Sequence, residues 1–144
     1  MTTQVNLDFL REEYFHLQSV VGEFDQRTLL IKGWSVTASL TAIGIALKEK
    51  LDYLLLVASF SAFLFWIVEA LWKSFQQAYY PRIRSIEDYM RSGVSAEFYS
   101  PAILRSWSSY WKWHHFIPIM LWGHVCLPHV AIFAVGLVLW SQSP

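Results

Sequence analysis

An apolar stretch from Thr28 to Leu47 contains a single cation, Lys32. No acidic residue adjacent in sequence neutralises this ammonium, and moving an unpaired charge into an apolar medium is costly. The nearest candidate partner is Glu69, on the next apolar stretch, which follows after a short turn centred on Glu49. Lys32 lies 17 residues before Glu49 and Glu69 lies 20 residues after it. The difference between these two separations corresponds to about 4.5 Å of helix rise, which two long side chains can span. We therefore predict an intramembrane ion pair between Lys32 and Glu69.

Such a pair has two interpretations. It fixes the register of two neighbouring helices, or it belongs to a permeation path, since charged residues inside membranes often mark one. The two side chains could also reach the nearby membrane interface separately.

The same stretch carries a row of small and hydroxyl residues. These residues are Ser35, Ala38, Ser39, Ala42 and Ala46. Small residues spaced four apart allow two helix backbones to approach closely. The row is expected to pack against the second apolar stretch of the same chain, or alternatively to form a subunit interface or line a narrow pore.

Arginines alternate with aromatic residues after the second apolar stretch. Arg82, Arg84 and Arg91 lie among several tyrosines. This mixture can bind a nucleotide or oligonucleotide by stacking and charge. It is also the ordinary composition of the cytoplasmic flank of a membrane helix, so both interpretations stay open.

Two histidines and a cysteine in the last apolar stretch do not form a metal-binding pattern. His124 and His129 are five residues apart and point to different faces of a helix, and no carboxylate accompanies them or Cys126. We expect no metal and no cofactor, and predict that these histidines form hydrogen bonds between helices. The sequence contains no nucleophile–base pair, phosphate-binding glycine loop or paired carboxylates, so we also expect that the protein is not an enzyme.

The composition indicates the elements that hold these residues. Of 144 residues, 55% are hydrophobic and 15% charged, and eight are tryptophans, a residue enriched at membrane interfaces. A membrane-spanning helix needs about 20 apolar residues. We predict one all-α membrane domain, residues 1–144, with transmembrane helices at 28–47, 51–72 and 116–140. The first two are joined by only three residues and must form a tight hairpin.

The charge distribution predicts the orientation. The helical connector at 73–112 has six basic and three acidic residues, whereas the C-terminal tail has no charged side chain. Basic flanks stay on the cytoplasmic side. We therefore expect a cytoplasmic N-terminus and connector, and a C-terminus outside.

Residues 6–27 are predicted to form a cytoplasmic amphipathic helix. Apolar residues recur at alternating spacings of three and four, which is the coiled-coil period. This N-terminal seam comprises Leu7, Leu10, Tyr14, Leu17, Val21 and Phe24. The helix is acidic, so we expect it to pack on protein rather than on anionic lipid. Its partner is another copy in a homo-oligomer, or the basic connector of its own chain.

Two segments resemble a known group of proteins. "IKGWSVTASLTAIGIAL", followed by "FLFWIVEALWKSFQQAYYPRIRSIEDY", is similar to small bacterial membrane proteins with a tight two-helix hairpin and a charged, aromatic cytoplasmic exit. The resemblance covers roughly residues 24–90. Some proteins of this shape are membrane effectors of anti-phage defence that oligomerise and depolarise or permeabilise the inner membrane. The resemblance implies a multi-pass protein of the bacterial inner membrane.

Three functions follow as hypotheses. The first is an oligomeric ion channel or pore-forming effector of anti-phage defence, with the N-terminal helix as a cytoplasmic gate and a ligand at Arg82, Arg84 and Arg91. The second is a non-conducting membrane adaptor or scaffold whose N-terminal helix recruits a partner protein encoded in the same operon. The third is a small transporter or membrane enzyme that depends on His124 and His129.

Overall fold

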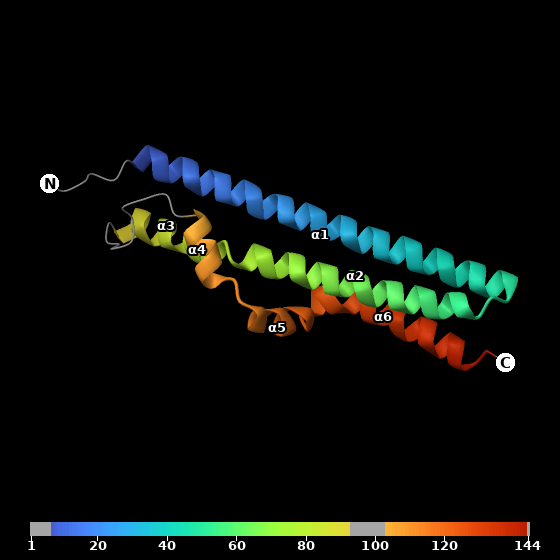
Figure 1. Cartoon of the computed structure of the whole chain (residues 1–144). Helices are drawn as coiled ribbons and strands as arrows, with labels where there is room; N and C mark the ends of the chain where they lie inside the picture. The colour runs from blue at the N-terminus through green and yellow to red at the C-terminus, as the bar shows by residue number, and fades with distance from the viewer. Residues whose placement is uncertain (1–6, 93–102, 144) are drawn as a thin grey trace.

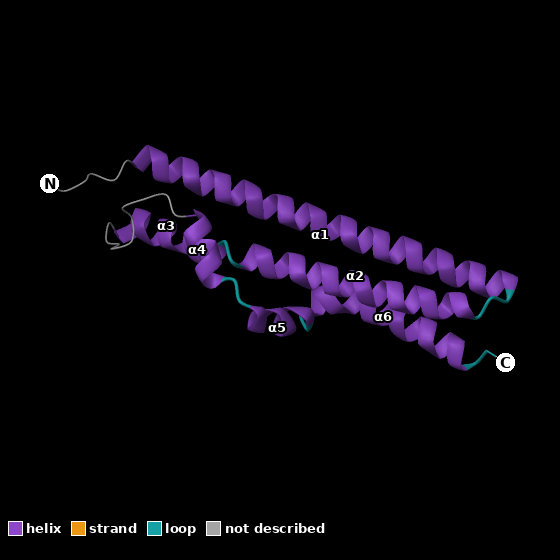
Figure 2. Ribbon diagram, in the orientation of Figure 1, coloured by secondary structure: helices purple, strands orange, loops and turns teal. Residues whose placement is uncertain are grey.

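All regular elements in the described part of the chain are helices. The computed structural model describes residues 7–92 and 103–143. The elements in chain order are α1 (Leu7–Glu49), α2 (Tyr53–Gln77), α3 (Tyr80–Ser92), α4 (Ile103–Tyr110), a single 3-10 turn η1 (Trp113–His115), α5 (Phe116–Met120) and α6 (Gly123–Ser141) (Figures 1 and 2). The predicted all-α class is confirmed.

Three of the described helical stretches are long and apolar enough to cross a bilayer. They are Leu7–Glu49, Tyr53–Ser92, in which α2 is the apolar part, and Gly123–Ser141. The number agrees with the three transmembrane helices expected from the sequence. In Figure 1, α2 lies between α1 and α6, with the α1–α2 turn and the C-terminus at one end and α3 and α4 at the other.

α1 joins two segments that the sequence pattern separates. Its 43 residues make a rod about 65 Å long, about twice the thickness of a bilayer core. No proline interrupts it, and Gly22 and Gly33 lie inside the helix without breaking it. Residues 7–27 of the predicted N-terminal segment and the predicted first span are therefore parts of one continuous helix.

A left-handed residue makes the hairpin turn. Lys50 has a φ of 55°, and the amide of Leu51 donates a 3.0 Å hydrogen bond to the carbonyl of Ala46. This is a Schellman cap, in which the residue after the helix adopts the left-handed conformation. It reverses the chain within three residues, so α2 runs back along α1.

α2 and α6 approach closely at one glycine. A Cβ atom on Gly136 would clash with Ser59 Oγ and lie 3.1 Å from the carbonyl oxygen of Leu55. Ser59 Oγ donates to the carbonyl of Leu55 at 2.9 Å and also lies 3.3 Å from the carbonyl of Phe133 on α6. Small residues let membrane helices come this close.

α3 continues beyond the end of α2 and lies beside the N-terminal half of α1 (Figure 1). α2 ends at Gln77 and α3 begins at Tyr80, with Pro81 in its first turn, a position where proline fits because no helical N–H is needed there. Ile83 and Ile86 are buried against Leu10, Leu17 and Val21 of α1.

The third apolar segment differs from the expected 116–140. α5 ends at Met120, and Trp122 has extended backbone angles (φ −62°, ψ 130°) before α6 begins at Gly123. The carbonyl of Trp122 accepts hydrogen bonds from the amides of Val125 and Cys126 at 2.8 and 2.9 Å. The break therefore falls at Leu121–Trp122, and Pro128 lies inside α6 without ending it.

Candidate functional site

A chain of polar side chains links α1, α2 and α6 inside the bundle. Lys32 Nζ lies 3.0 Å from Glu69 Oε1. The other carboxylate oxygen, Glu69 Oε2, lies 2.9 Å from His129 Nε2. His129 Nδ1 in turn lies 2.9 Å from Ser35 Oγ. The structure thus brings together the two residues that the sequence pairs, and adds a histidine and a serine.

These groups are withdrawn from solvent. The side chains of Glu69 and His129 are fully buried, as is Ser35, and only Lys32 is partly exposed, at 22%. Removing a charge from water costs several kcal/mol unless partners compensate it. Glu69 is compensated on both of its oxygens, which is why a carboxylate can occupy this position.

The proton positions follow from charge balance. One ammonium and one carboxylate already neutralise each other, so a neutral His129 leaves the cluster without net charge. In that arrangement Nε2–H donates to Glu69, and the Ser35 hydroxyl donates to Nδ1. Every strong donor and acceptor of the imidazole then has a partner.

One buried hydroxyl extends the cluster along α1. Ser39 lies one helical turn after Ser35 and is fully buried, and its Oγ has no hydrogen-bond partner among the described residues. Buried polar atoms normally have one. The buried polar residues inside the bundle therefore include Ser39 in addition to the four bonded residues.

The predicted row of small residues divides between two environments. Ser35, Ser39 and Ala46 are buried and Ala42 packs against the α1–α2–α6 core, whereas Ala38 is exposed. Most of the row therefore lies in contact with the protein's own helices, as the packing interpretation expects.

The opposite face of α1 carries a second set of small residues. Gly33, Thr37, Thr41 and Gly44 are all exposed. At 100° per residue they lie on the far side of the helix from Ser35, Ser39 and Ile43. We call this set the outward α1 face.

A buried ion pair that the sequence does not predict holds α1 to α3. Arg82 Nε and Nη2 donate to the two carboxylate oxygens of Glu13, each at 2.8 Å. The two side chains are only 6% and 2% exposed. The opposite net charges of the N-terminal helix and the connector were the available signal, but they do not identify individual residues.

The predicted N-terminal seam lies largely against this same α3. Leu10, Leu17 and Val21 are buried there and Tyr14 packs beside them, donating a 3.1 Å hydrogen bond to Glu87. Phe24 contacts the rings of Trp72 and Tyr79. Leu7 is 61% exposed. The connector of the same chain, one of the two partners considered for the seam, therefore contacts it.

A second polar network joins α1 to α2 between the apolar segments and α3. Lys73 Nζ lies 2.6 Å from Asp25 Oδ1 and 2.8 Å from Gln76 Oε1. Gln76 donates to Asp25 and to the carbonyl of Val21. The hydrogen bond from Lys73 lowers the pKa of Asp25, against a smaller opposing effect of burial.

The three predicted ligand-binding arginines occupy different environments. Arg82 is engaged with Glu13, whereas Arg84 and Arg91 are exposed on α3. Arg84 lines a cavity of about 300 Å³ between the α2–α3 bend, the end of α4 and α5. Any ligand of this region would therefore meet Arg84 or Arg91 rather than Arg82.

The histidines and the cysteine also separate. His129 is buried in the polar chain, while His124 is exposed and Cys126 is half-buried. Over the residues that the structure describes, no group of three metal-ligating side chains gathers at one point.

Comparisons with known proteins identify no relative. No protein-family model matches the chain, and neither a curated protein nor a solved structure does.

Proposed function

We propose that this protein is an oligomeric ion channel or pore-forming protein of the bacterial inner membrane, with the N-terminus in the cytoplasm and the C-terminus outside. The observation that carries the proposal is the outward α1 face. Gly33, Thr37, Thr41 and Gly44 are exposed in the C-terminal half of α1, a helix long and apolar enough to span a bilayer.

Such a face is poorly suited to lipid and well suited to protein or water. Glycine and threonine present little apolar surface, and in membranes such residues favour close helix contact and hydrogen bonds between helices. A Cβ atom added to Gly33 or to Gly44 would have no neighbouring atom within 4 Å. Another helix could therefore approach the backbone closely, or the two threonine hydroxyls could face a water-filled path.

The protomer alone is too small to enclose a pore, so conduction requires several copies. A second exposed surface lies on α2, where Leu56, Phe60 and Leu64 border a shallow depression of about 460 Å³. Contacts between two different surfaces of identical subunits are heterologous, and such contacts generate rings when the rotation closes. Contact between the outward α1 face and this α2 surface would build a ring of this kind.

The continuity of α1 supports a cytoplasmic gate. Because one helix runs from Leu7 to Glu49, displacement of its N-terminal half would be transmitted to the outward α1 face. The Glu13–Arg82 pair and the seam hold that half against α3. We propose that this packed state is one of the two states of the gate, and that a ligand with a higher affinity for the other state shifts the equilibrium. In an anti-phage effector this ligand would be a defence signal.

Oligomeric mass and ion flux test the proposal together. Purified protein in lipid nanodiscs and in vesicles should form a defined oligomer and release trapped ions. Thr37→Leu should reduce both oligomer formation and flux at least tenfold, because a bulky side chain blocks the outward α1 face. Val135→Leu is the matched control, since Val135 is 49% exposed on α6, away from this face. A monomer that carries no ions would contradict the proposal.

The adaptor hypothesis is favoured by a different surface. Phe15 is 58% exposed on the N-terminal half of α1, on the side of the helix opposite Leu10, Leu17 and Val21, which pack against α3. An exposed aromatic side chain at this position is available to a partner protein. Phe15→Ser should abolish capture of a partner by an adaptor while leaving a channel's ion flux unchanged, so the two functions predict opposite results.

A further inference from the structure

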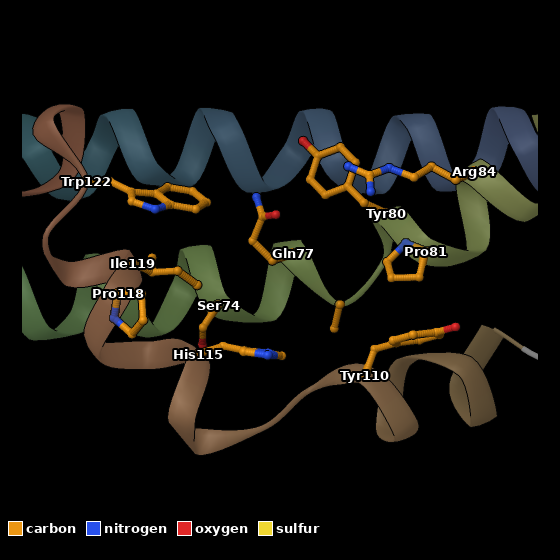
Figure 3. Close-up of a pocket in the computed structure, with 11 residues that line it drawn as sticks. Ser74, Gln77, Tyr80, Pro81, Arg84, Tyr110, His115, Pro118, Ile119 and Trp122 are labelled. Atoms are coloured by element: carbon orange, nitrogen blue, oxygen red, sulfur yellow. The ribbon is translucent and has the colours of Figure 1, made fainter.

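The cavity beside Arg84 has walls of two kinds (Figure 3). At one end lie Arg84, Tyr80 and Tyr110, and at the other end lie Pro118, Ile119 and Trp122. The first group comes from α3 and the end of α4, and the second from α5 and the break before α6. The cavity is therefore polar and cationic at one end and mostly apolar at the other, where Ser74 and His115 also line it.

The polar end is rich in hydrogen-bond donors and free of acid. Arg84 forms no ion pair with any described carboxylate, and no acidic residue is among the described side chains that line the cavity. Burial raises the pKa of the Tyr80 phenol, which keeps it protonated as a donor. A guanidinium with adjacent phenols recognises phosphate oxygens through charge-assisted hydrogen bonds.

The apolar end points toward the spanning helices. α5 leads into α6, and Ile117 and Leu121 beside the cavity are 65% and 68% exposed. Three tryptophans gather along the segment from α4 to η1 that leads into α5. Trp107 and Trp111 are stacked at 5.9 Å, and Trp111 contacts Trp113. Tryptophan belts mark the boundary between lipid tails and head groups.

We infer that this cavity binds the phosphate group of an anionic phospholipid, with the phosphate at Arg84 and Tyr80 and the apolar part of the lipid directed along Pro118 and Ile119. Its volume of about 300 Å³ is at the lower end of small-molecule sites and suits a head group rather than a whole lipid. The inference rests on the cavity and not on conduction, although a bound lipid at the α2–α3 bend would be placed to influence the proposed gate.

Binding to detergent-purified protein tests the inference without measuring flux. Native mass spectrometry would count bound phosphatidylglycerol during a titration. Arg84→Gln should weaken binding at least tenfold. Arg91→Gln is the matched control, because Arg91 is exposed on the same helix and does not line the cavity, and it should change the affinity by less than twofold. Tyr110→Ala, which removes one wall of the cavity, should also weaken binding.

Two further probes separate the sources of the phosphate. Glycerol phosphate, which has no acyl chain, should bind at least tenfold more weakly than phosphatidylglycerol, and equal affinity would reject the lipid in favour of a water-soluble phosphate ester. Phosphatidylcholine carries a balancing cation and should bind more weakly than phosphatidylglycerol. Equal weakening by Arg84→Gln and Arg91→Gln, or equal binding of both lipids, would overturn the site. A channel that fails to conduct would leave these results unaffected.

Discussion

The buried carboxylates Glu13 and Glu69 are each paired with a basic residue, and the positions of these pairs show which parts of the site were predictable. Lys32 and Glu69 could be paired from sequence because a turn of three residues fixes the register of α1 against α2. His129 could not be assigned to them, since it follows a long connector that sets no register for α6. The Glu13–Arg82 pair, whose residues lie 69 positions apart, is hidden for a different reason, since the bend between α2 and α3 interrupts the register that the hairpin sets.

Replacement of Glu69 should expose the dependence of Lys32 and His129 on it. Glu69→Gln removes the charge that compensates a largely buried ammonium, and breaking such a pair destabilises a protein by about 3–5 kcal/mol. The double variant Lys32→Met/Glu69→Gln should recover part of this loss, because no uncompensated charge remains. Denaturant unfolding in detergent would measure the cycle. Additive effects of the two single substitutions would contradict the pairing.

Two neighbouring arginines should differ sharply in their effect on stability. Arg82→Ala leaves Glu13 buried and unpaired, with an expected loss of about 3–5 kcal/mol. Arg84→Ala removes an exposed side chain that has no ionic partner among the described residues, and surface changes of this kind shift stability by about 0.5 kcal/mol or less. Thermal unfolding of both variants would decide. Equal losses would show that the Glu13–Arg82 pair does not hold α3 on α1.

At the scale of the elements, helix existence was predictable and helix boundaries were less so. Apolar length and the short turn give α1, α2 and their antiparallel packing. The continuity of α1 was not evident, because the change from an amphipathic to an apolar pattern reads as a boundary while the backbone has no reason to break there. The break at Trp122 was also not evident, because a helix break is normally expected at a proline. Pro118 lies within α5 and Pro128 within α6, and neither is at the break.

Gly136 should be the glycine at which α2 and α6 tolerate no side chain. Gly136→Ala places a methyl group against Ser59 and the Leu55 carbonyl, and overpacking of this kind costs about 1–3 kcal/mol. Gly22→Ala is the control, because nothing lies within 4 Å of its added Cβ and alanine favours a helix interior by about 1 kcal/mol over glycine. Unfolding measurements should therefore change in opposite directions, and a stabilised Gly136→Ala variant would contradict the close approach.

At the scale of the whole molecule, the structure has two different ends. The apolar segments of the three long helices lie toward the α1–α2 turn and the C-terminus, and the ion pairs Glu13–Arg82 and Asp25–Lys73 lie toward the other end. Composition and charge predicted this separation because each is a sum over many residues. The outward α1 face was not predictable, since it depends on which side of α1 the remaining helices cover.

The end of the molecule that holds the ion pairs should make the free energy of unfolding depend on pH through Asp25. The hydrogen bond from Lys73 lowers the pKa of Asp25 in the folded state, so the pair stabilises the fold above the unfolded pKa of about 3.9, and this stabilisation is lost as the pH falls through the folded pKa. Asp25 is 53% exposed, so the contribution at pH 7 should be about 1 kcal/mol or less.

The measurement is the difference in unfolding free energy between the native protein and Asp25→Asn, taken at pH 7, 5 and 3. The difference should be constant from pH 7 to 5 and shrink toward pH 3, since protonation then removes the charge in the native protein as well. A difference that persists undiminished at pH 3 would mean that Asp25 contributes through its shape or its neutral hydrogen bonds rather than through its charge.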